Sequence, residues 1–127
     1  MKATLDKAFG YQNNAMALPV ASVDRAVSFY EQTLGFRIVS RSDTPHKTVV
    51  LARDAVQMAL VESGGDPSQD GCAFHVTGLD ALLDEFKVYG ISKGAGEIGI
   101  EDHGGTTFRV FYVIAPDGLC YWFGEKQ

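Results

Sequence analysis

Two segments of the chain carry apolar residues at helical spacing. The first spans residues 23–34, and the second lies within TGLDALLDEFKVYG, residues 77–90. Ser22 offers an N-cap hydroxyl to the first helix, while Gly35 and Gly90 end the two helices. Intervals of three and four place the apolar residues on one stripe of each helix. The stripes consist of Val23, Ala26, Val27, Tyr30 and Leu34 in the first helix, and of Leu79, Leu82, Leu83 and Phe86 in the second.

Short apolar runs predict strands before and after each helix. Residues 63–70 separate the two groups of strands and are rich in Gly, Asp, Ser and Pro, so we interpret them as a linker. In the first half the predicted strands are 15–20, 36–41, 47–52 and 56–62, and in the second half 71–76, 96–100, 106–113 and 119–124.

The two halves repeat one pattern at a constant offset of 56 positions, which aligns Ala15 with Gly71. A fixed offset that superimposes strands, caps and helical stripes indicates an internal duplication. We therefore predict an α+β fold in which two βαβββ repeats form curved antiparallel sheets around a cleft. The repeats cover about 15–62 and about 71–125 of a single domain, residues 1–127.

Charge and composition narrow the range of partners. The 127 residues carry a formal net charge of −5 and a sequence pI near 5.0. Nucleic-acid binders normally have a clustered basic face, so we expect no nucleic-acid partner. No apolar run reaches the roughly 20 residues of a membrane-spanning helix, and the N-terminal stretch has no secretory core, so we expect a cytoplasmic protein without membrane contact. Cys72 and Cys120 show no metal-ligand spacing and are interpreted as reduced strand residues.

Three phrases of the sequence resemble a known superfamily. They are LPVASVDRAVSFYEQTLGF in the first half, AFHVTGLDAL in the second, and GGTTFRVFYVIAPDG before the last strand. Together they are similar to the vicinal-oxygen-chelate superfamily, which contains glyoxalase I, bleomycin-resistance proteins and extradiol dioxygenases. The resemblance implies a paired βαβββ fold, commonly a homodimer, with ligand sites in the concave sheets.

The metal-using members of this superfamily hold a divalent ion with His and Glu residues on the first, fourth, fifth and eighth strands of the two repeats. Carried onto this chain, those positions are Ala15, Ala59 (or Met58 if the register slips by one), Gly71 and Trp122. None of these side chains offers the carboxylate or imidazole that such a site requires. The departure predicts a cup without a metal cofactor.

Strand alternation indicates which side chains point into the cup. Trp122 should do so, because its neighbours Tyr121 and Phe123 then face the helix layer. Its indole is interpreted either as filling the space that the lost ligands leave or as a stacking wall for a flat ligand. His75 shares the face of Gly71 and could bind a ligand or act as a general base, or it could be a satisfied core or rim histidine.

The strand before the Pro-Asp-Gly turn carries Arg109 and Tyr112, which lie three residues apart and therefore face opposite sides. Arg109 could clamp a carboxylate or phosphate, or could be an exposed strand arginine. The expected ligand-binding residues are Trp122, His75, Arg109, Met58, Ala15 and Gly71.

An improvised metal site is conceivable from Glu101, His103 and His46, of which the first two belong to the stretch EDHGG. The glycines predict a sharp turn there, so a solvated loop is the favoured interpretation.

These observations favour a metal-independent small-molecule binding protein that sequesters a drug or toxic metabolite. The acidic net charge would suit a cationic ligand. The alternative is a glyoxalase-like or dioxygenase-like lyase, isomerase or oxygenase with a non-standard metal site or an acid-base residue such as His75. A third hypothesis is an interaction module that keeps the dimer scaffold and fills its cup.

Overall fold

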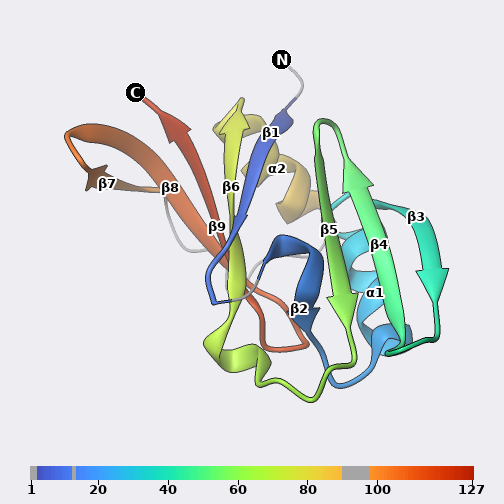
Figure 1. Ribbon diagram of the computed structural model, residues 1–127. Helices are drawn as coiled ribbons and strands as arrows, with labels where there is room; N and C mark the ends of the chain where they lie inside the picture. The colour runs from blue at the N-terminus through green and yellow to red at the C-terminus, as the bar shows by residue number, and fades with distance from the viewer. Residues whose placement is uncertain (1–2, 13, 90–97) are drawn as a thin grey trace.

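The computed structural model describes residues 3–12, 14–89 and 98–127. Its strands form two sheets, which lie side by side with both helices behind them in Figure 1. The four-stranded sheet has the order β2 (Leu18–Pro19), β5 (Val56–Val61), β4 (Thr48–Arg53), β3 (Arg37–Ser42). The five-stranded sheet has the order β1 (Thr4–Gly10), β6 (Gly71–Thr77), β9 (Cys120–Lys126), β8 (Thr106–Ile114), β7 (Gly99–His103). The helices are α1 (Val23–Gln32) and α2 (Leu79–Val88), and short 3-10 turns cover η1 (Ala15–Ala17) and η2 (Pro67–Gln69).

Both sheets contain the same unit of a strand, a helix and three further strands. In the first unit β2 runs parallel to β5, and in the second β6 runs parallel to β9, while the other pairs within each unit are antiparallel. The predicted α+β fold with two βαβββ units and two curved sheets is therefore confirmed. No helix in the part of the chain that the structure describes is long and apolar enough to cross a membrane.

A carboxylate from the end of a strand caps each helix. Ser22 accepts a hydrogen bond from the Arg25 N–H at 3.3 Å, as the sequence predicts, and the Glu62 carboxylate accepts from the Val23 N–H at 2.9 Å. The N-cap residue of α2 is Gly78, which has no side chain to serve as a cap. There the Glu125 carboxylate accepts from the N–H groups of Gly78 and Leu79, at 2.9 and 3.1 Å. Such caps are each worth about 1 kcal/mol. The predicted helix end at Gly90 lies outside the described residues.

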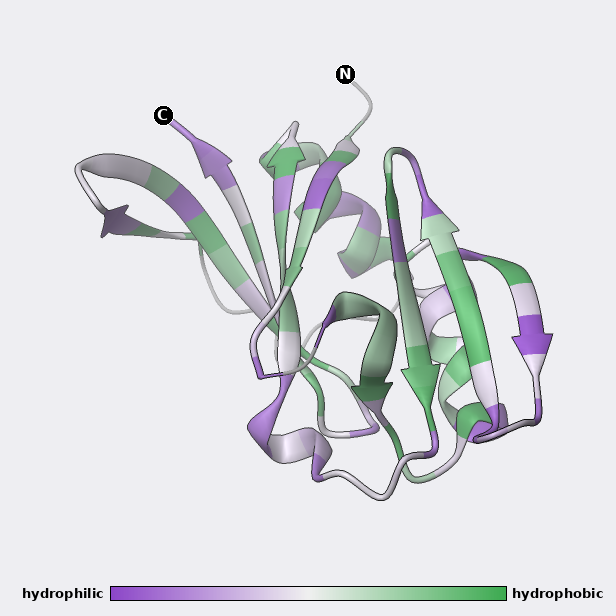
Figure 2. Cartoon of the chain, in the orientation of Figure 1, coloured by the Kyte–Doolittle hydropathy of each residue, from purple (hydrophilic) through white to green (hydrophobic). Residues whose placement is uncertain are grey.

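The core lies between the sheets and the helices. Tyr121 and Phe123 of β9 are fully buried on the helix side of the five-stranded sheet. Phe123 stacks on Phe74 and on Phe111, with ring centroids 5.2 Å apart in each pair. Each such aromatic pair contributes about 0.5–1.5 kcal/mol beyond the burial of its surface. In the other sheet, Figure 2 shows that β4 and β5 are largely hydrophobic, whereas the edge strand β3 contains hydrophilic residues.

Side chains from the two units also meet directly. The Tyr30 hydroxyl of α1 donates to the Asp117 carboxylate at 2.6 Å and lies 2.6 Å from the Tyr121 hydroxyl. Arg53 of β4 is buried and donates two hydrogen bonds to the Glu85 carboxylate of α2, at 2.7 and 3.0 Å. These contacts fix the first unit against the second.

Two expectations about secondary structure were wrong, and one strand was not predicted. Residues 15–20 form η1 and the two-residue strand β2 rather than one strand, because the Asn14 side chain accepts from the Met16 N–H and starts a turn. The N-terminal strand β1 was not predicted, and it pairs antiparallel with β6.

The strand predicted over 96–100 lies partly outside the described residues, and the strand that the structure describes there is β7. Glu101, Asp102 and His103 therefore belong to a strand rather than to a loop, and the turn is confined to Gly104 and Gly105, both at positive φ.

Candidate functional site

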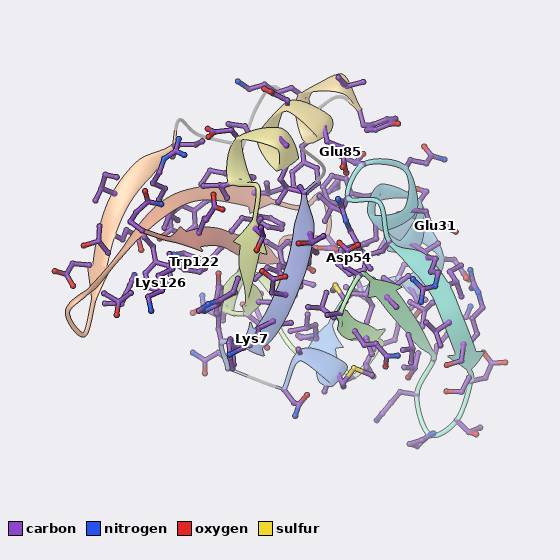
Figure 3. All side chains as sticks on the ribbon, turned by 90° about the horizontal axis from the view of Figure 1, so that it is seen from above. Lys7, Glu31, Asp54, Glu85, Trp122 and Lys126 are labelled. Carbon is purple, nitrogen blue, oxygen red and sulfur yellow. The ribbon has the colours of Figure 1, made fainter. Side chains whose placement is uncertain are left out.

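The face of the five-stranded sheet turned away from α2 carries the candidate site. Cross-strand partners share a face, so Trp122 of β9 lies with its partners Ala73 of β6 and Tyr112 of β8 on this surface. Figure 3 shows the labelled Trp122 on the side of the sheet opposite α2. The surface contains a hollow of about 390 Å³, which is called the aromatic hollow below. Its lining residues are Tyr11, Ala73, His75, His103, Thr106, Phe108 and Trp122.

Trp122 lies flat along its own strand. A Cβ atom built on Gly124 would come within 2.2 Å of the indole ring, so the ring occupies the space that a side chain at position 124 would take. Its Nε1–H donates to the Glu101 carboxylate at 3.0 Å, and the residue is 8% exposed. The indole therefore forms the floor of the aromatic hollow rather than a free-standing wall.

Glu101 joins three donors on this face. Its Oε1 atom accepts from the Trp122 indole and lies 2.7 Å from His103 Nε2, and its Oε2 atom accepts from the Tyr112 hydroxyl. The hydrogen bond from Tyr112 holds the pKa of Glu101 below its usual value, and the bonds from Trp122 and His103 act in the same direction. Glu101 is thus an ionised carboxylate that orients the rings around the hollow.

His75 lies among aromatic rings. Its ring centroid is 5.4 Å from that of Phe9, 5.5 Å from that of Phe108 and 5.7 Å from that of Trp122. Burial lowers the pKa of His75, and the nearby Lys7 ammonium lowers it further, so the neutral ring dominates at pH 7. Its nitrogens form no hydrogen bond with any residue that the structure describes, which leaves them available to a ligand.

Other expected ligand-binding residues lie elsewhere. Arg109 faces the helix side and donates two hydrogen bonds of 2.8 Å to Asp80 in the first turn of α2, so Tyr112 takes the hollow side of this strand. Met58 is fully buried in the core beneath the other sheet. Ala15 is buried in η1 and belongs to the same core cluster. Expecting Arg109, Met58 and Ala15 to line the cup was therefore wrong.

Gly71 lies at the end of the hollow face but leaves no room for a side chain. A Cβ atom there would come within 1.8 Å of the Cys120 carbonyl oxygen and 2.7 Å of the Tyr11 ring. A side chain as large as an imidazole therefore does not fit at position 71. Ala15, Ala59 and Trp122 carry no carboxylate or imidazole, so the four residues to which the resemblance assigns the metal ligands do not fit a divalent ion.

The improvised metal site does not form as a set. His46 lies in the turn between β3 and β4 of the other sheet, while Glu101 and His103 meet on β7. Residues two apart on a strand share a face, which explains this contact. Among residues 3–12, 14–89 and 98–127, no group of three or more His, Cys, Asp or Glu residues could hold a metal ion.

Sequence reasoning missed several residues of this face. Phe9 belongs to the unpredicted strand β1 and Tyr11 follows its last residue, although their spacing of two residues is a strand signal. Glu101 and His103 were assigned to a loop because of the two glycines that follow. The alternation of Glu101 with His103 before a two-glycine turn is typical of a hairpin and could have shown that both residues share a face.

Comparisons with known proteins agree with this architecture. The model of the Glyoxalase/Bleomycin resistance protein/Dioxygenase superfamily matches residues 12–119. A bleomycin resistance determinant encoded on the transposon Tn5 has a similar structure, with a TM-score of 0.66 and 23% identity over 92% of this chain and 99% of that chain.

Two further structures are similar. For a bleomycin-binding protein complexed with bleomycin, the TM-score is 0.65 and the identity 22%, over 92% of this chain and 100% of that chain. For TnmS3, an antibiotic binding protein from Streptomyces sp. CB03234, the values are 0.64 and 18%, over 88% of this chain and 93% of that chain. Comparison with curated protein sequences gave no significant match. At these identities, the structural likeness establishes the fold.

Proposed function

We propose that this chain, which belongs to the Glyoxalase/Bleomycin resistance protein/Dioxygenase superfamily, is a metal-independent binding protein. Its ligand would be a flat, largely apolar small molecule. The observation that carries this proposal is the aromatic hollow, in which rings from four strands and from the segment after β1 surround about 390 Å³. This volume lies within the range of about 300–1,000 Å³ that is typical of small-molecule sites. Sequestration of a drug or toxic metabolite is the role that we propose for this binding.

Binding would depend on burial of the ligand's rings. Phe108 and His75 stand edge-to-face, with centroids 5.5 Å apart and planes 80° apart, so their edges and faces can both contact a planar molecule. Aromatic contacts of this kind contribute about 0.5–1.5 kcal/mol each beyond area burial. Related folds named as bleomycin-binding and antibiotic binding proteins support small-molecule binding as the shared role.

A second copy of the chain would complete this surface. Tyr112 and Ile114 of β8 follow the hollow along the same face and are 42% and 62% exposed, and Phe9 on β1 is 52% exposed. Exposed apolar side chains gathered on one face are typical of interaction surfaces. We therefore propose a homodimer, as the resemblance implies. Light scattering with the Ile114→Glu variant tests it, because an unchanged dimer mass would exclude this face.

Acid-base catalysis is a second candidate function. The Glu101 carboxylate holds His103 Nε2 at 2.7 Å, and the imidazole lines the aromatic hollow, so Nδ1 could exchange a proton with a bound molecule. Ligands recovered after prolonged incubation distinguish the two functions. Chemically unchanged ligand supports binding alone, whereas conversion that stops in the His103→Asn variant supports catalysis.

The main experiment is a thermal-shift screen of planar aromatic compounds. A ligand that binds the folded state raises the melting temperature in proportion to RT ln(1 + [L]/Kd). We expect hits to quench Trp122, the single tryptophan, and Phe108→Ala to weaken binding several-fold. Tyr89→Ala, an exposed aromatic at the end of α2, is the matched control and should leave affinity unchanged.

Two results would contradict the proposal. Hits that raise the melting temperature without changing Trp122 fluorescence would exclude the aromatic hollow as the site. A stoichiometric divalent ion in protein purified without chelator, or loss of ligand affinity in EDTA, would overturn metal independence.

A further inference from the structure

A second hollow adjoins the aromatic hollow on the same face of the sheet. It measures about 270 Å³, and His75 lines both hollows. Gly124 contributes no side chain to its wall, while Lys7 of β1 and Lys126 of β9 supply cationic side chains. Lys7 is the cross-strand partner of His75, and Lys126 is the partner of Phe108, so both lysines lie on the hollow face. This second space is called the lysine hollow below.

Neither lysine has an ion-pair partner among the residues that the structure describes. Figure 3 labels Lys126 and Lys7 on the same side of the sheet as Trp122. Other lysines of the chain are engaged differently, since Lys47 contacts the Asp24 carboxylate at 2.6 Å. The two cations at the edge of the aromatic hollow are thus available to a ligand.

The carboxylates near the lysine hollow are already engaged. Asp6 accepts from the Thr77 hydroxyl at 2.6 Å and from the Thr4 hydroxyl at 3.3 Å. Both oxygens of Glu125 accept backbone N–H groups at the start of α2. Glu101 on the far side of the aromatic hollow accepts from three side chains. Hydrogen bonds to these carboxylates stabilise their charge and use some of the roughly four acceptor sites of each group, so each is less open to a cationic ligand than a free carboxylate would be.

The groups that are open to a ligand here are therefore cationic or neutral, whereas the net charge of the whole chain is −5 and would suit a cationic ligand. Charges separated by more than a Debye length of about 8 Å contribute little at physiological ionic strength, so the groups lining the site matter more than the total. Close to the aromatic hollow, the unpaired groups are ammonium ions and a neutral imidazole.

Building on the proposed binding function, we propose that the ligand is an aromatic carboxylic acid. Its ring occupies the aromatic hollow, and its carboxylate extends past His75 toward Lys7 and Lys126. Two separate ammonium groups suit an anionic group of the ligand, and neither hollow is lined by an arginine fork of the kind that favours bidentate phosphate binding. His75 lies at the junction of the two hollows, where its ring can donate a hydrogen bond to the acid.

The test compares three probes with the same ring system: naphthalene-2-carboxylate, neutral naphthalene-2-carboxamide and cationic 2-naphthylmethylammonium. Affinity is measured by calorimetry, and the site is located from the NMR cross-peak of the single indole N–H, that of Trp122. Exposed ion pairs each change affinity by about 1.5- to 5-fold, so we expect the carboxylate to bind about fivefold more tightly than the amide. This preference should shrink in 0.5 M salt.

Variants separate the lysines from general charge effects. Lys7→Gln combined with Lys126→Gln should abolish the preference for the carboxylate while leaving the amide affinity unchanged. Lys87→Gln, in the last turn of α2 on the other side of the sheet, is the matched control and should keep the preference. All three substituted positions are exposed, so thermal unfolding should stay close to wild type.

The outcomes are distinguishable. If the amide binds as tightly as the carboxylate, or the ammonium probe binds most tightly, the acid specificity is wrong while aromatic binding stands. If the preference persists in the double lysine variant, the lysine hollow is not its source and the inference fails. If no probe binds or moves the indole cross-peak, the inference fails together with the proposed function of the aromatic hollow.

Discussion

Gly124→Ala tests the floor of the aromatic hollow directly. The added Cβ atom would come within 2.2–2.7 Å of three atoms of the Trp122 ring, closer than carbon atoms can pack, so the indole must leave its position. That movement breaks the hydrogen bond from Nε1 to Glu101, and hydrogen bonds to charged groups contribute about 1.5–3 kcal/mol. Replacing glycine by alanine restricts the unfolded chain and returns about 0.4–1 kcal/mol.

The net loss of unfolding free energy should be about 0.5–2.5 kcal/mol. For a domain of this size, we expect the melting temperature to fall by about 2–10 °C. Thermal unfolding followed by circular dichroism measures the stability, and the indole N–H cross-peak reports the broken hydrogen bond. Affinity for planar aromatic ligands should fall in parallel, because the floor of the site is displaced.

Gly99→Ala provides the matched control. Gly99 lies on β7 of the same sheet, and a Cβ atom there would meet nothing within 4 Å. Its melting temperature should change by no more than the equivalent of about 0.5 kcal/mol. Wild-type stability and an unmoved indole cross-peak in Gly124→Ala would refute the argument, since the ring could then not lie over position 124.

Three other predictions concern caps and charges. Ser22→Ala should cost about 1 kcal/mol in urea unfolding through loss of the α1 cap, and an unchanged midpoint would contradict the cap. Glu85→Ala should cost about 3 kcal/mol, because it leaves the buried Arg53 without its main partner, and adding Arg53→Met should restore part of the loss. The lowered pKa of Glu101 means that its stabilisation is present above the unfolded pKa of about 4.3 and is lost as the pH falls through the lower folded value. The stability difference between wild type and Glu101→Gln, measured in urea, should therefore shrink from pH 6 to pH 3, and a constant difference would exclude this linkage.

Much of the fold could be predicted from hydrophobic spacing. The stripe of α1, its cap at Ser22 and the positive φ of Gly35 agree with the structure, because these are local properties of the sequence. The strand β1 escaped prediction because its stability comes from pairing with β6, a partner that lies more than sixty residues away in sequence. Pairing over such distances leaves little trace in a short charged segment.

The site was harder to predict than the fold. Alternation placed Trp122 and His75 on one face, and the structure brings their ring centroids to 5.7 Å. Alternation could not show that the indole would lie down over Gly124, because that depends on the space left by a residue two positions away. Nor could it exclude Arg109, whose direction is set by the contact with Asp80 on α2.

The hydrogen bond between Tyr30 and Asp117 joins two of the sequence phrases that resemble the superfamily. Tyr30 belongs to FYEQTLGF and Asp117 to APDG, and their side chains join at 2.6 Å on the helix side of the sheets. The two phrases therefore supply the two side chains of one hydrogen bond that holds the first unit to the second. A chain could exchange every side chain of its hollows and still keep both phrases. The family model matches residues 12–119, which include both phrases, so this contact belongs to the scaffold that the superfamily shares, whereas the ligand that we propose would be selected by side chains on the opposite surface.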